Sequence, residues 1–103
     1  MKKTAKQTTK KTVPAASPHR FGDDWTIEAE FRGETLHYLE NGRRASIDWT
    51  WTRGYKIYPD SLRGWQEPDG STTPLRDEER DEIVRRLVIH AGEQQGVVLQ
   101  VEY

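Results

Sequence analysis

The sequence predicts an α+β fold: a four-stranded antiparallel meander, one C-terminal amphipathic helix on its apolar face, and a final fifth strand. Three observations predict it. Apolar and polar residues alternate through residues 25–57, which is the period of a strand. Glycine-containing turns interrupt this alternation at hairpin-like intervals. An apolar stripe at helical spacing follows at 83–91, and a last alternating run covers 97–103.

Length and composition favour one small domain. The chain has 103 residues, of which 33% are hydrophobic and 32% charged, so its core must be small. It contains no cysteine, which excludes disulfides and thiolate metal sites and fits a reducing compartment. No apolar run approaches the roughly 20 residues of a membrane span, and no apolar segment follows the first lysines. We therefore expect a cytoplasmic protein with no secretory signal and no membrane partner.

Charge divides the chain into two parts. Residues 1–22 carry six basic and no acidic residues, a charge of about +6. Residues 23–103 carry 10 basic (16 minus 6) and 17 acidic residues, a charge of −7. Because residues 1–22 have almost nothing to bury, we expect a disordered basic tail followed by a single domain from residue 23.

The basic tail has two interpretations. The first is a solvated leader. The second is an electrostatic arm for an acidic partner or nucleic acid. In the second case the candidate nucleic-acid-binding residues are Lys2, Lys3, Lys6, Lys10 and Lys11.

Hairpin registers follow from matching the apolar faces. A first turn at 32–33 sets Ile27 opposite Tyr38. Asn41-Gly42 is the strongest short hairpin signal and sets Tyr38 opposite Ala45. Both registers place apolar residues on one side of the sheet and polar residues on the other, which supports the meander.

The third hairpin decides where two tryptophans lie. A three-residue loop at 52–54, with its glycine in the left-handed conformation, sets Trp49 opposite Ile57 and keeps Trp51 on the same face. A one-residue slip would expose both indoles. The sequence therefore predicts that Trp49 and Trp51 belong to the core, and Pro59 ends the fourth strand.

A helix is predicted after an irregular segment. Residues 60–65 favour a short helical turn, and residues 67–71 a loop. Pro74 suits the first turn of a helix, and the acidic run 77–79 complements a helix N-terminus. The predicted apolar stripe consists of Ile83, Val84, Leu87, Val88 and Ala91. Gly92 or Gly96 then stops the helix.

The sequence contains no specific catalytic motif. The histidines lie far apart, without metal-ligand spacing: His19, His37 and His90. Glu28, Glu30 and Asp48 share the polar sheet face, where they either bind a divalent ion or form a solvated surface. We favour the solvated surface and expect a protein that is not an enzyme and has no cofactor or metal.

Trp65 also has two interpretations. Together with Leu62 it can close one end of the core. Alternatively it anchors a partner, because Trp, Tyr and Arg are enriched in binding hot spots and Tyr58 and Arg63 are near in sequence.

Residues 55–87 resemble the immunity protein 74 family of bacterial polymorphic-toxin systems. The matching positions are Asp60, Ser61, Leu62, Trp65, Pro68, Glu79 and Ile83. The resemblance implies a non-catalytic protein-binding inhibitor that occludes a cognate toxin. The acidic body is compatible with a basic toxin domain. On this hypothesis the expected partner-binding residues are Tyr58, Arg63, Trp65, Glu67 and Asp69.

An alternative function is that of a nucleic-acid-associated accessory protein that binds through the lysine-rich tail. The charge of −7 over residues 23–103 argues against it, because phosphate groups repel an acidic body.

Overall fold

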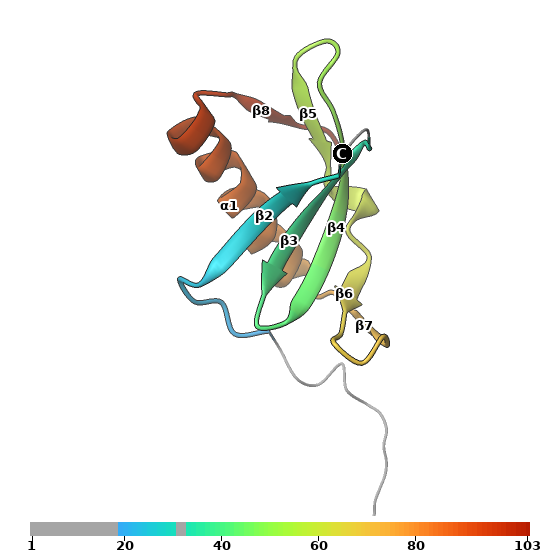
Figure 1. Ribbon diagram of the computed structural model, residues 1–103. Helices are drawn as coiled ribbons and strands as arrows, with labels where there is room; N and C mark the ends of the chain where they lie inside the picture. Colours follow the sequence, from blue (N-terminus) through green and yellow to red (C-terminus); the bar gives the residue numbers. More distant parts are fainter. Residues whose placement is uncertain (1–18, 31–32) are drawn as a thin grey trace, which may run out of the picture.

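The computed structural model describes residues 19–30 and 33–103 and has an α+β fold (Figure 1). One helix lies across one side of a curved, mostly antiparallel sheet. The predicted α+β class is therefore confirmed, although the sheet is mixed and has more strands than the predicted meander with a fifth strand. In chain order the elements are β2 (Trp25–Ala29), β3 (Thr35–Glu40), β4 (Arg43–Thr50), β5 (Tyr55–Tyr58), η2 (Pro59–Ser61), β6 (Gly64–Gln66), β7 (Thr72–Pro74), α1 (Asp77–Gln95) and β8 (Leu99–Val101).

The sheet is mixed and has a branch at β4. Its main order is β2-β3-β4-β5-β8, with β8 parallel to β5 and the other neighbours antiparallel. The end of β4 pairs with β5, whereas its beginning pairs with β6, which in turn pairs with β7. One long strand thus organises both parts of the sheet.

All three predicted hairpin registers are confirmed. Ile27 pairs with Tyr38, Tyr38 with Ala45, and Trp49 with Ile57. Asn41 and Gly42 have φ values of 55° and 76°, as a type I′ turn requires, and Gly54 has φ 83°. The first predicted turn includes Arg32, which lies outside the described residues.

Residues 59–74 correct the prediction in two places. The short helical turn covers only η2, and Gly64–Gln66 forms strand β6 along the part of β4 that β5 leaves unpaired. Pro74 belongs to the three-residue strand β7 and not to the helix. Strand β6 pairs on both sides, with β4 and with β7. Among the described residues β7 pairs with β6 alone, so it can accommodate a proline, which has no N–H.

Helix α1 begins after Arg76 and ends at Gly96, which has φ 65°. The Glu79 carboxylate accepts a hydrogen bond of 3.0 Å from the Arg76 backbone N–H, which satisfies one free donor of the first turn. The helix residues buried against the sheet are Glu79, Ile83, Val84, Leu87 and Ala91.

Burial of the tryptophans differs from the prediction. Trp49 is only partly buried against the core, and Trp51 is 42% exposed, so the prediction that Trp51 is a core residue is wrong. The parity of β4 is correct, since Ala45 and Ile47 are fully buried. However, the β4–β5 hairpin projects beyond the rest of the sheet (Figure 1), where α1 does not cover it.

The packed domain begins earlier than residue 23. His19 is only 7% exposed, and Phe21 packs against the core. Residues 19–22 therefore belong to the domain, which corrects the predicted boundary. The predicted disorder of residues 1–18, with the five candidate lysines, lies outside the described residues. Among the described residues no helix is long and apolar enough to cross a membrane.

Candidate functional site

The five predicted partner-binding residues do not form one surface. Arg63 is exposed between η2 and β6, and Asp69 lies in the exposed loop before β7, where its carboxylate accepts hydrogen bonds from Ser71. The Tyr58 hydroxyl is 3.3 Å from Thr50 Oγ1 on the polar face of the sheet. Trp65 and Glu67 instead belong to a polar network around β6.

Trp65 is a core residue in this structure. Its side chain is 0% exposed, as is that of Leu62, so the indole does not reach the surface in this conformation. Strand pairing explains the burial: Trp65 lies opposite Ala45 of β4 on the apolar face, and the small alanine leaves room for the ring. The core interpretation is therefore the one that agrees with the structure.

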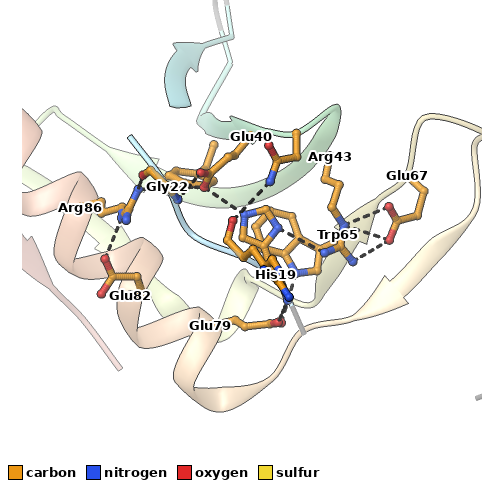
Figure 2. A network of polar contacts seen from close by, with 12 residues as sticks. His19, Gly22, Glu40, Arg43, Trp65, Glu67, Glu79, Glu82 and Arg86 are labelled. Carbon is orange, nitrogen blue, oxygen red and sulfur yellow. Dashed lines mark hydrogen bonds and ion pairs between the residues drawn. The ribbon is translucent and has the colours of Figure 1, made fainter. Parts of the chain in front are cut away.

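A network of buried and partly buried polar groups surrounds Trp65 (Figure 2). The His19 ring stacks on the indole with 4.2 Å between centroids, and the indole Nε1–H donates to Glu79 Oε1 at 3.1 Å. The Arg43 guanidinium also lies over the indole, 4.8 Å from the ring centroid, and forms a bidentate ion pair with Glu67. Sequence patterning gave no signal for this network, since His19 lies in a segment with no apolar periodicity.

Hydrogen bonding fixes the tautomer of His19. Arg43 Nη1 is 3.2 Å from His19 Nδ1, and because a guanidinium can only donate, Nδ1 must accept. The proton of the neutral ring is therefore on Nε2, which donates to Glu40 Oε1 at 3.0 Å.

Glu40 and Glu79 are buried but remain charged. Burial on its own would raise the pKa of Glu40, but hydrogen bonds from Tyr38, His19 and the Gly22 N–H outweigh it and hold this pKa below its usual value. Burial is likewise outweighed at Glu79, whose pKa is lowered by N–H donors of Arg76, His19 and Trp65. Burial and the adjacent Glu40 in turn raise the pKa of Tyr38.

The folded protein should lose stability in acid. The pKa of Glu82 falls from 4.5 to about 2, mainly through the hydrogen bond from Arg85 and further through Arg86, and those of Glu40 and Glu79 are also lowered. A carboxyl whose pKa is lower in the folded state stabilises it above the unfolded pKa and ceases to do so below the folded one. We expect the free energy of unfolding to fall between pH 4.5 and about 2.

Urea unfolding at a series of pH values measures this loss. Glu82→Gln should flatten the dependence, whereas replacement of the exposed Glu102 by Gln should not. A stability that rises on acidification would contradict the assignment of charged carboxylates.

A second candidate site is the aromatic end, which we define as Trp49, Trp51 and Tyr55. The ring centroid of Trp49 lies 5.0 Å from that of Trp51 and 6.1 Å from that of Tyr55, so the three side chains form one cluster. Trp51 is 42% and Tyr55 38% exposed. Large rings that are clustered and partly exposed are typical of binding surfaces.

A pocket of about 120 Å³ adjoins the aromatic end. Trp49 and Tyr55 line it together with apolar residues of the sheet and the last turns of α1, among them Leu36, Leu87, Ala91 and Leu99. The Trp49 Nε1–H is buried and has no hydrogen-bond partner among the described residues. An unsatisfied buried donor of this kind costs stability.

The sequence could have indicated the aromatic end only through the length of the helix, which limits how much of the sheet the helix can cover. A helix of 19 residues is about 28 Å long and cannot cover every strand end of the sheet. Alternation alone assigns a residue to a face, but it does not say whether another element covers that face.

The polar sheet face carries a short row of hydrogen-bonding side chains. His37 Nδ1 is 2.8 Å from Ser46 Oγ, and His37 Nε2 is 3.3 Å from Glu30 Oε2. Serine, histidine and glutamate resemble a nucleophile–base pair, but a catalytic serine also needs free N–H donors for an oxyanion. Here His37 and Ser46 lie opposite each other on the paired strands β3 and β4, and Glu30 follows the end of β2. Among the described residues no group of acidic residues and histidines is arranged to hold a metal ion.

Comparison with known proteins adds no relative. No family model, no curated protein and no solved structure matches the chain.

Proposed function

We propose that this protein is a small non-catalytic protein-binding module and that the aromatic end is its binding surface. The observation that carries the proposal is the cluster of exposed Trp51 and Tyr55 beside the pocket. Tryptophan and tyrosine contribute much of the energy of protein interfaces, and a pocket next to them can accept an anchoring side chain of the partner. A meander stiffened by one amphipathic helix would hold these rings in a fixed arrangement, which limits the entropy lost on binding.

The partner we propose is a basic protein domain, and the proposed role is that of an immunity protein that occludes a cognate toxin. Residues 23–103 carry a charge of −7, and opposite potentials raise association rates. The resemblance of residues 55–87 to the immunity protein 74 family supports the same role. Tyr58, Arg63 and Asp69 would then lie at the rim of the interface or outside it.

Replacement of Trp51 by alanine should weaken partner binding by about 30-fold or more, the effect of losing a hot-spot residue. Its effect on stability should be small because the side chain is partly exposed. The measurement is calorimetric titration of wild-type and variant chains with the protein captured by the wild type. Ile89→Ala is the matched control, since Ile89 is 41% exposed on α1. Equal affinities of wild type and Trp51→Ala would contradict the proposal.

Added salt and nucleic acid distinguish the partner classes. Association with a basic protein should slow as salt is raised. A gel shift of oligonucleotides at low salt that disappears when residues 1–22 are removed would instead support the nucleic-acid alternative, in which the lysine-rich tail binds. Co-expression with a candidate toxin encoded beside this gene tests immunity directly. The proposed role predicts that the protein restores growth, and a failure to restore growth would contradict it for that toxin.

A further inference from the structure

Residues His19–Gly22, which we call the clasp, are bound by the rest of the domain in the way that a peptide is bound by its receptor. The His19 backbone N–H donates to Glu79 Oε2 at 2.6 Å, and the Gly22 N–H donates to Glu40 Oε2 at 2.6 Å. The Gly22 carbonyl accepts from Arg86 Nη1 at 2.7 Å. Main-chain groups at both ends of the clasp are therefore held by charged side chains.

Two clasp side chains are also recognised. The His19 ring lies between the carboxylate of Glu40, the guanidinium of Arg43 and the indole of Trp65. The Phe21 ring lies 5.1 Å from the Arg86 guanidinium and contacts the core. Between them the exposed Arg20 contributes its carbonyl, which accepts a hydrogen bond from Asn41.

The groups that bind the clasp, which we call the socket, are Glu40, Arg43, Trp65, Glu79 and Arg86. Each carboxylate and each guanidinium of the socket has another partner outside the clasp. Glu40 retains the Tyr38 hydroxyl and Glu79 retains the Arg76 N–H. The two guanidiniums retain their ion pairs with Glu67 and Glu82. The socket is thus preformed, and no charge in it would be left without a hydrogen bond if the clasp departed.

Most of the apolar core is also independent of the clasp. The buried apolar residues lie between Leu36 and Leu99, and Phe21 packs at their margin. Departure of the clasp would expose one face of the Trp65 indole and leave the contacts between sheet and helix in place. A segment with these properties can open locally without global unfolding.

We propose that the socket is a peptide-recognition site for an extended segment that carries histidine and an aromatic residue two positions apart, and that the clasp occupies it as an exchangeable ligand. A partner chain with the same pattern would compete for the socket by displacing His19–Gly22. The middle residue is free to vary because Arg20 is exposed. The last residue need not be glycine, since a Cβ at Gly22 would lie 3.4 Å from Glu40 Oε2, an ordinary contact.

Hydrogen exchange of the full chain tests whether the clasp is exchangeable. We expect the Gly22 amide to exchange at least about tenfold faster than the slowest amides of β4 and α1, through an opening that does not depend on denaturant. Exchange of the Gly22 amide only through global unfolding would make the clasp an integral part of the fold and would overturn the proposal.

Peptide binding tests whether the socket recognises a segment that is not part of its own chain. In the full-length His19→Ala/Phe21→Ala variant the clasp is weakened, and an acetylated peptide of residues 19–24 should raise the melting temperature in a saturable manner. The matched control is the same peptide with alanine in place of its histidine and phenylalanine. Equal effects of the two peptides, or none, would overturn the proposal. If the variant does not fold, the exchange experiment on the wild type decides.

Discussion

Replacement of Trp65 by alanine is expected to lower the free energy of unfolding by about 3–5 kcal/mol, the range for truncating a large buried aromatic residue. The side chain is 0% exposed and contacts both the clasp and the sheet, so its removal would leave a cavity that could collapse only in part. The Glu79 carboxylate would also lose one of its three donors. Since small domains are stable by only about 5–15 kcal/mol, this one change removes a large part of the total.

Urea unfolding followed by circular dichroism measures the effect. Trp65→Phe keeps an aromatic face for His19 but no indole N–H, and should cost clearly less than alanine. Trp51→Ala, directly after β4, is the control, with an expected loss of at most about 1 kcal/mol because the ring is partly exposed. A Trp65→Ala chain with the wild-type midpoint would show that Trp65 does not belong to the core.

Replacement of Glu79 by alanine is expected to cost about 3 kcal/mol. Three donors lose their acceptor at once: the backbone N–H groups of His19 and Arg76 and the indole N–H of Trp65. An unpaired buried donor costs about 1–3 kcal/mol, and water that enters beside the clasp should reduce the sum. Loss of the bond to Arg76 also weakens the first turn of α1.

Glu78→Ala is the matched control, since Glu78 is the exposed neighbour in the same helical turn. It should change the free energy of unfolding by less than about 0.5 kcal/mol. Glu79→Gln separates charge from hydrogen bonding, because the amide keeps one acceptor oxygen. Equal stability of the Glu78→Ala and Glu79→Ala chains would contradict the role of Glu79 as a buried acceptor.

The strands and their registers could be predicted because they depend on local rules. Asn41-Gly42 favours one turn type, and matching the apolar faces on either side leaves one register for Tyr38 and Ala45. Strand β6 could not be predicted, because Gly64–Gln66 is too short for a period. It forms only where β4 offers an unpaired edge.

The candidate sites were harder to predict than the fold. A tryptophan beside glycine is compatible with a core residue and with a partner anchor, so the sequence leaves both interpretations of Trp65 open. The exposure of Trp51 depends on where α1 ends relative to the β4–β5 hairpin. The burial of His19 depends on Glu40 and Glu79, which are distant in sequence and come together only in the folded chain.

By itself the sequence determined the α+β class, the faces of the strands and the pairing of three hairpins, because alternation and turn residues act between neighbours along the chain. Only the tertiary structure decided which tryptophan is covered, that β8 runs parallel to β5, and that His19–Gly22 fills a charged socket. Whether the helix covers a side chain, and which charged groups pair, depends on contacts between segments that are distant in sequence. Their free energy depends on three-dimensional position, which no local pattern of residues records.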